Sequence, residues 1–245
     1  MKRIILTIVF VFFMWNGYSQ TTDRVTDTQE NAWYMYFGTF KVNPKLSVHG
    51  EIQLRRSGLI KDPQQLLLRT GLNYHLNKNV IATVGYGFID THPYGKQPVA
   101  KRFIEHRLWQ QLILNHSESR FLFNHRYRQE QRWLETPLAV DNDFNYVNRS
   151  RYRLMVNIPL NNRTLEKGTL FLSIYDEIFL NFGKNVNRNI FDQNRIYAAI
   201  GFQIGESSNI QLGYLNQKIQ KGDGVHFENN KTFQVAFSHT VNLAN

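Results

Sequence analysis

The stretch FLFNHRYRQEQRW, residues 121–133, separates into two faces when successive residues are assigned to opposite sides of a β-strand. One face carries phenylalanine, histidine, tyrosine and tryptophan, and the other carries asparagine, arginine and glutamate. Side chains alternate across a strand with a period of two residues. An arginine that faces lipid at mid-membrane costs about 2–4 kcal/mol, whereas an arginine in a wet lumen costs far less. The alternation therefore predicts a strand of a membrane barrel with its arginines directed inward.

Interleaved basic and aromatic residues are also typical of a single-stranded nucleic-acid platform, and a net charge of +10 suits such a protein. The N-terminus argues against this interpretation. Residues 1–19 have Lys2 and Arg3 before an apolar run, and Gly17 and Ser19 before the expected cut, which together indicate a signal peptide. The apolar run is too short to span a membrane as a helix. We expect an exported chain of charge +8 with no nucleic-acid partner.

Residues 20–245 are predicted to form one all-β domain, an antiparallel transmembrane β-barrel in the outer membrane. Eleven strand-like segments follow one another: 32–41, 46–56, 65–76, 80–90, 102–115, 120–133, 149–158, 169–181, 195–204, 210–220 and 232–243. Short turns alternate with longer polar loops between them, which is typical of outer-membrane barrels. A soluble β-sheet protein is the alternative. Residues 20–31 are polar and are expected to be an N-terminal extension.

The number of strands is expected to be about 12, in a range of 10–12, because bacterial single-chain barrels usually have an even number. Eleven segments leave the parity open. Either residues 20–31 return through the lumen or along the wall, or one segment has been merged or wrongly assigned.

The arginine-rich segments are consecutive, so they are expected to pair and form one basic wall of the lumen. Its candidate residues are Arg107, Arg126, Arg128, Arg132, Arg149, Arg151 and Arg153. The candidate counter-charges are Glu51, Glu105, Glu130 and Glu177. One interpretation is a charge ladder that braces the barrel. The other is a narrow pore or binding lumen that attracts small anionic solutes.

Aromatic residues near the strand ends favour girdles at the two membrane interfaces, although packing inside the barrel is an equal alternative for each. Examples are Trp33, Tyr34, Tyr36, Tyr74, Trp109, Trp133, Tyr152 and Phe237.

The order of the segments resembles an uncharacterised family of exported barrels, domain of unknown function 2490. The stretches that carry the resemblance are AWYMYFGTF, LSVHGEIQLRR, RTGLNYHLNKNVIATVGYGF, FIEHRLWQQL, FNHRYRQEQRW and RYRLMVNIPL. The resemblance covers nearly all of the mature chain. It implies an outer-membrane barrel and implies no reaction, cofactor or catalytic residue.

The sequence offers little evidence for a catalytic site. His116 lies near Ser117 and Ser119 in a turn, and His239 points away from the side taken by Ser238. The histidines are scattered over different segments rather than placed at metal-ligand spacing. We expect no enzyme activity, no cofactor and no metal. The expected partners are outer-membrane lipid, the barrel-assembly machinery and small anionic solutes. A closed structural barrel whose external loops bind a partner is the first alternative, and a lipid-modifying enzyme is the second.

Overall fold

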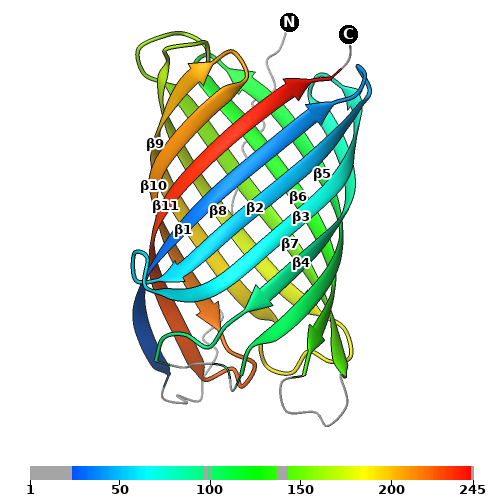
Figure 1. Cartoon of the computed structure of the whole chain (residues 1–245), viewed down its shortest axis with the longest axis vertical. Helices are drawn as coiled ribbons and strands as arrows, with labels where there is room; N and C mark the ends of the chain where they lie inside the picture. Colours follow the sequence, from blue (N-terminus) through cyan, green and yellow to red (C-terminus); the bar gives the residue numbers. More distant parts are fainter. Residues whose placement is uncertain (1–23, 97–98, 100, 137–142, 244–245) are drawn as a thin grey trace, which may run out of the picture.

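The computed structural model describes residues 24–96, 99, 101–136 and 143–243, which form a closed barrel of eleven strands (Figure 1). The strands are β1 (Val25–Lys41), β2 (Leu46–Ser57), β3 (Asp62–Asn77), β4 (Val80–Thr91), β5 (Phe103–Glu118), β6 (Phe121–Glu135), β7 (Phe144–Pro159), β8 (Leu170–Phe182), β9 (Phe191–Gly205), β10 (Ser208–Gln220) and β11 (His226–Asn242). The predicted signal peptide lies outside the described residues. Within those residues, no helix is long and apolar enough to cross a membrane.

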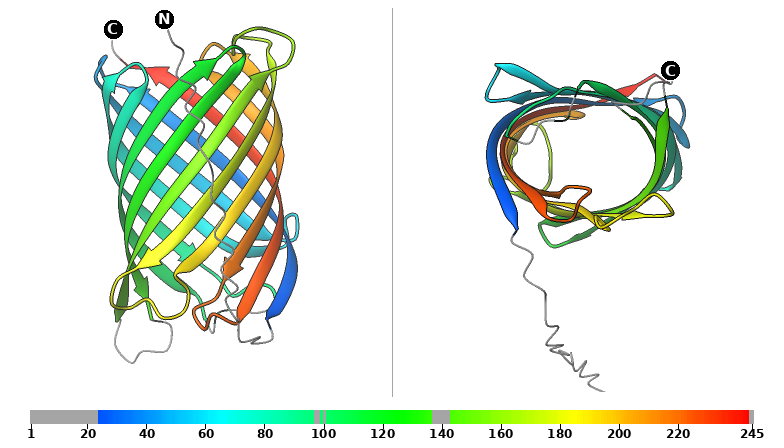
Figure 2. Two further views of the ribbon diagram at one scale, coloured as in Figure 1. Left: turned by 180° about the vertical axis from the view of Figure 1, so that it is seen from behind. Right: turned by 90° about the horizontal axis from the view of Figure 1, so that it is seen from below.

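The barrel closes between its first and last strands. Each strand pairs antiparallel with the next one in the chain, and β1 pairs with β11 in parallel from Val25↔His226 to Lys41↔Asn242. An odd number of strands joined by hairpins leaves the first and last strands running in the same direction, so the closing pair must be parallel. The count of eleven strands falls within the predicted range of 10–12. The number is odd, and the parallel pairing of β1 with β11 allows a barrel with an odd number of strands to close. Figure 2 shows the closed ring along the barrel axis.

The expected N-terminal extension is wrong for residues 25–31, which belong to β1. Pairing between β1 and β2 starts only at Ala32↔Arg56, whereas pairing with β11 starts at Val25. The first part of β1 is therefore hydrogen-bonded along one edge by β11 and extends beyond the end of β2. This explains why a strand segment carries so polar a sequence.

The turns between β1 and β2, β3 and β4, β5 and β6, β7 and β8, and β9 and β10 lie at one end of the barrel, at the top of Figure 1. We call this the short-turn end. The opposite end, called the long-loop end, carries the remaining connections, of which the structure describes residues 58–61, 92–96, 99, 101–102, 136, 143, 183–190 and 221–225.

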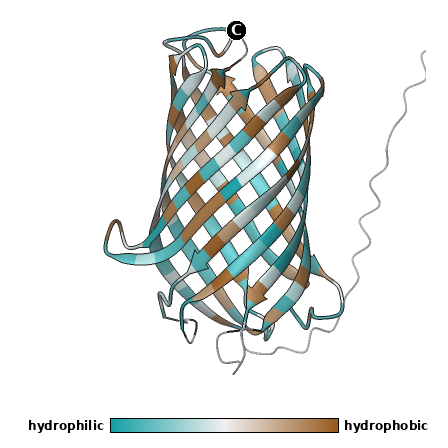
Figure 3. Ribbon diagram, turned by 45° about the vertical axis from the view of Figure 1, so that its right-hand side comes forward, coloured by the Kyte–Doolittle hydropathy of each residue, from teal (hydrophilic) through white to brown (hydrophobic). Residues whose placement is uncertain are grey.

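Polar and apolar residues alternate along the strands, as the hydropathy colouring in Figure 3 shows. In β2, Ile52 and Leu54 are exposed on the outside, whereas Glu51, Gln53 and Arg55 are buried inside. The same division holds in β9, where Ile196 and Ile200 are exposed and Tyr197 and Ala199 are buried. The outer surface is therefore richer in apolar residues, and the interior is richer in polar and charged ones.

The interior also contains two of the tryptophans. Trp33 and Trp109 are 2% and 0% exposed, so neither belongs to an interfacial girdle. The Trp109 ring lies against Gly85, where an added Cβ would come within 2.4 Å of both the ring and the Thr70 carbonyl oxygen. A glycine is therefore required opposite Trp109 for the interior to hold an aromatic side chain of this size.

The loop between β4 and β5 turns into the long-loop end of the lumen. The Tyr94 hydroxyl donates to Glu228 Oε2 at 3.0 Å, and Glu228 also pairs with Lys221. Burial, together with the Glu228 charge, raises the pKa of the Tyr94 hydroxyl well above its ordinary value. Gly95 has a φ of +69° and lies so close to Gln29 that a Cβ would clash with its amide. These contacts fix residues 94 and 95 against β1 and β11.

Candidate functional site

The basic wall lies on β5, β6 and β7, whose pairing brings arginines directly opposite one another. Arg107 pairs with Arg132, Arg126 with Arg153 and Arg128 with Arg151 in the strand register. Like charges in directly opposite positions are destabilising by themselves. The arrangement is therefore stable only if carboxylates lie between the guanidinium groups or if anions neutralise them.

Glu130 is the central carboxylate of the wall and is fully buried. Its Oε2 accepts two hydrogen bonds from Arg149, at 2.6 and 2.8 Å, and its Oε1 accepts one from Arg151 at 2.7 Å. Arg107 Nη1 lies 3.4 Å from the same Oε1. Several charge-assisted hydrogen bonds converge on this carboxylate, which is what keeps a buried charge tolerable.

The other three predicted counter-charges are also ion-paired. Glu105 accepts a two-pronged pair from Arg132, at 2.8 and 2.9 Å, and a third bond from Arg107 Nε at 2.7 Å. Glu177 Oε1 accepts from Arg126 Nη2 at 2.7 Å and from Arg151 Nε and Nη2 at 3.0 and 2.7 Å.

The fourth, Glu51, accepts from Arg69 at 2.8 Å on the opposite side of the lumen. All four carboxylates that were expected as counter-charges thus lie inside the barrel and contact arginines.

Sequence reasoning missed five interior charges: Arg55, Arg69, Arg195, Asp192 and Glu228. Arg55 and Arg195 lie on the polar faces of clearly alternating segments, so alternation could have identified them. Asp192 is at the start of β9 and receives Arg149 Nη1 at 2.7 Å, two strands away. No local sequence signal indicates that contact, because it depends on the curvature of the barrel.

Three arginines have no carboxylate partner in the part of the chain that the structure describes. Arg55 donates to Gln53 and Gln65 and lies 3.8 Å from the Trp33 ring centroid. Arg153 donates to Asn124 at 2.8 Å. Arg195 donates to Gln193 at 3.2 Å and also lies over the Trp33 ring, at 5.1 Å. Amide oxygens and aromatic faces hold these cations without neutralising them.

Arg128 is nearly as isolated, since its closest carboxylate contact is 4.0 Å, to Glu130. It donates twice to Gln111, at 2.9 and 2.6 Å, and stacks over Trp109 at 4.5 Å. Counted over the described strands, ten interior arginines face six interior carboxylates. The arginines are Arg55, Arg69, Arg107, Arg126, Arg128, Arg132, Arg149, Arg151, Arg153 and Arg195, and the carboxylates are Glu51, Glu105, Glu130, Glu177, Asp192 and Glu228, the last of which pairs with Lys221. The interior is strongly basic.

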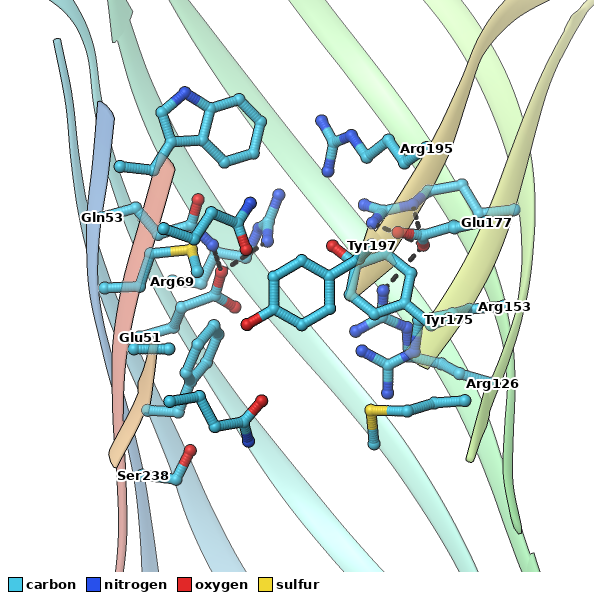
Figure 4. A pocket seen from close by; sticks show the side chains of 18 residues that line it. Glu51, Gln53, Arg69, Arg126, Arg153, Tyr175, Glu177, Arg195, Tyr197 and Ser238 are labelled. Carbon is cyan, nitrogen blue, oxygen red and sulfur yellow. Dashed lines mark hydrogen bonds and ion pairs between the residues drawn. The ribbon is translucent and has the colours of Figure 1, made fainter. Parts of the chain in front are cut away.

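Two cavities lie within the lumen. The first, of about 250 Å³, reaches Gln211 and Ser238 toward the short-turn end, and we call it the short-turn cavity (Figure 4). The second, of about 200 Å³, reaches Tyr94 and Lys221 toward the long-loop end, and we call it the long-loop cavity.

Trp33, Arg69, Arg151 and Arg195 line both cavities. These four residues lie between the two cavities, and we call them the partition.

The described residues contain no group of three or more histidine, cysteine, aspartate or glutamate side chains placed to hold a metal ion. His116 stacks on Phe123 at 4.7 Å and on His125 at 5.2 Å. His239 stacks on Phe237 at 6.0 Å. Both histidines that had been weighed as catalytic candidates therefore contact aromatic rings.

Comparison with known proteins gives a family but no activity. An uncharacterised protein of Methylorubrum extorquens is 26% identical over 170 residues, which cover 68% of this chain and 69% of that protein. No solved structure matches the chain. The family described as protein of unknown function (DUF2490) matches residues 30–228, from the middle of β1 into β11. The match spans most of the barrel, and the chain belongs to this family.

Proposed function

We propose that the protein is an outer-membrane β-barrel whose arginine-rich lumen admits and binds small anionic solutes. The observation that carries the proposal is the excess of interior arginines over interior carboxylates. A surplus of fixed positive charge inside low-dielectric walls focuses the potential and concentrates anions. The partition restricts the passage, so the solutes must be small.

The outer surface supports the membrane part of the proposal. Leu72, Val84, Ile196 and Leu212 are between 49% and 57% exposed and belong to strands on different sides of the barrel. An outer surface on which many exposed side chains are apolar is typical of contact with lipid. The predicted signal peptide would direct the chain to export, and the barrel-assembly machinery would insert it with the short turns in the periplasm.

A closed structural barrel is the second candidate, and the network of interior ion pairs is the observation that favours it. Arg151 joins Glu130 to Glu177, and Arg149 joins Glu130 to Asp192, so paired charges connect β6 to β9. Such a brace needs no solute. In that case the loops at the long-loop end would supply the function by contacting a partner.

Single-channel recording of the refolded mature chain under a salt gradient separates the two candidates. We expect steady openings with a reversal potential that favours anions. Replacing both Arg55 and Arg195 by glutamate should abolish most of this preference, because the change lowers the lumen charge by four units and neither arginine forms an ion pair with a described carboxylate. Arg163→Gln, in the exposed connection between β7 and β8, is the control and should leave the preference unchanged. A folded but silent barrel, or one that favours cations, would reject the passage.

A further inference from the structure

Two arginines in the short-turn cavity have unused hydrogen-bond donors. Arg126 and Arg153 lie directly opposite each other in the pairing of β6 with β7, and both line the cavity. Arg126 donates Nη2 to Glu177, and Arg153 donates Nη2 to Asn124. The Nε–H group of each is buried and has no hydrogen-bond partner among the described residues. The Nη1 groups of both arginines also donate to no described residue, and a bound anion that accepts hydrogen bonds from them would reduce the repulsion between the two charges.

The charge around this cavity is unbalanced as well. Five arginines and two glutamates line it, which leaves a surplus of three positive charges: Arg69, Arg126, Arg151, Arg153, Arg195, Glu51 and Glu177. Arg69 and Arg151 hold the glutamates. In Figure 4 the Arg126 and Arg153 side chains lie on one wall of the cavity, and Glu51 and Arg69 lie on the other. The free positive charge is thus concentrated on the wall formed by β6, β7 and β9.

An apolar surface lies beside these cations. The rings of Tyr175 and Tyr197 stack with centroids 4.6 Å apart and an interplanar angle of 26°. Met35, Phe37 and Met155 line the same cavity. Flat aromatic side chains favour offset stacking with another ring. The lining is therefore suited to an anion that also has a flat apolar body, and it is poorly suited to a fully hydrated inorganic ion.

The volume limits the size of the occupant. About 250 Å³ lies just below the range of about 300–1,000 Å³ that is typical of small-molecule pockets. A single small ring bearing one carboxylate is of this order of size. The planar fork of a guanidinium also matches the two oxygens of a carboxylate.

We propose that the short-turn cavity is a binding site for a small aromatic carboxylate, held by Arg126 and Arg153 and packed against Tyr175 and Tyr197. This site rests on the proposed function, because its ligand must enter the lumen as an anion. It goes further by assigning the chemical class of the solute and the cavity that selects it. The long-loop cavity would attract anions without selecting for a ring.

Titration calorimetry of the refolded, full mature chain in detergent micelles tests the site with benzoate as the probe. We expect benzoate to bind more tightly than acetate, which lacks the ring, and than benzamide, which lacks the charge. Arg153→Gln should weaken benzoate binding about tenfold or more, the loss expected for one charge-assisted hydrogen bond. Tyr175→Leu should weaken benzoate binding and leave acetate binding unchanged.

Arg55→Gln is the matched control, because Arg55 also lacks a carboxylate partner but lines only the long-loop cavity. It should weaken benzoate binding far less than Arg153→Gln does, and by the same factor as it weakens acetate binding, because it removes lumen charge but no contact with the ligand. Arg153→Lys keeps the charge without the planar fork and provides a second variant if Arg153→Gln does not fold. Folding of every variant is checked by the heat-dependent mobility of the barrel in gels. Equal affinity for benzoate and acetate, or equal losses for Arg153→Gln and Arg55→Gln, would overturn the site.

The conductance experiment separates the two proposals. Anion-selective openings without benzoate binding would reject the carboxylate site and leave the anionic lumen intact. Benzoate binding that responds to Arg153 in a silent barrel would support the site and reject the passage. A barrel that neither conducts nor binds any of the probes would reject both.

Discussion

Arg151 holds the centre of the charge ladder, and its replacement by glutamine should be among the most destabilising single changes in the barrel. Its guanidinium donates twice to Glu177, at 3.0 and 2.7 Å, and once to Glu130, at 2.7 Å. It also lies 4.2 Å from the Phe179 ring centroid. Glutamine keeps a polar side chain but removes the charge and most of these donors.

The loss of unfolding free energy in Arg151→Gln depends on the hydrogen bonds that Glu130 and Glu177 still accept from other arginines. Glu130 keeps two hydrogen bonds from Arg149, and Glu177 keeps one from Arg126. Removing one partner of a buried ion pair costs about 3–5 kcal/mol when the other charge is left alone. Because neither glutamate is left without a cation, we expect the lower end, about 3 kcal/mol of unfolding free energy.

Arg153→Gln provides the comparison for the free energy of unfolding. This substitution removes only one hydrogen bond, to the neutral amide of Asn124, and it also removes the repulsion between Arg153 and Arg126. We expect that change to cost about 0–1 kcal/mol. Unfolding in urea of the barrel inserted in lipid vesicles, followed by tryptophan fluorescence, gives both values. Equal costs for the two substitutions, or a cost below about 1 kcal/mol for Arg151→Gln, would refute the division into bracing and free arginines.

Three further outcomes are expected. Trp33→Leu removes a residue that separates the two cavities, so single-channel recording should show a larger conductance; an unchanged conductance would mean that Trp33 does not limit the passage. Gly95→Ala should detach the loop between β4 and β5, because the added Cβ would clash with Gln29. Amide hydrogen exchange near residue 94 should then be faster, whereas the control Gly222→Ala, whose Cβ meets no nearby atom, should leave that exchange unchanged. Hydrogen bonds from the His226 and Val225 backbone N–H groups and from the His226 ring lower the pKa of Asp223 to about 2 from an ordinary 3.8. The stabilisation from the Asp223 carboxylate is therefore present above its ordinary pKa of 3.8 and is lost as the pH falls toward about 2, and Asp223→Asn should lack this pH dependence. Titration followed by nuclear magnetic resonance gives the Asp223 pKa directly, and a value near 3.8 in the native chain would contradict the assignment.

Much of the fold could be predicted from the sequence because the outer and inner faces have opposite chemistry. Alternation alone places Ile52 outside and Glu51 inside, and it resolves Asp176 and Glu177, of which the structure exposes the first and buries the second. The order of the hairpins then brings β5, β6 and β7 together. Consecutive pairing was enough to expect one basic wall, since these contacts are local in the sheet.

The remaining features depend on the closed barrel. The parallel pair of β1 and β11 joins the first and last strands, and residues 25–31 pair with β11 but with no residue of β2, so no hairpin pattern marks them as a strand. Arg149 reaches Asp192 and Arg126 reaches Glu177 across two strands. Trp33 and Trp109 resemble girdle residues in sequence, but glycine and arginine neighbours accommodate them inside. Each of these contacts depends on curvature that a single strand does not encode.

The distribution of arginines between paired and unpaired positions bears on why the lumen is basic. A brace is stable when its charges match, and every further buried cation adds repulsion and a desolvation cost. Bracing accounts for Arg149 and Arg151, which each join two carboxylates. It does not account for Arg55, Arg153 and Arg195, where an uncharged side chain would make similar contacts at lower electrostatic cost. The surplus has a physical reason if anions enter the lumen and supply the missing negative charge, and this favours a basic lumen that takes up solutes over a lumen that is only braced.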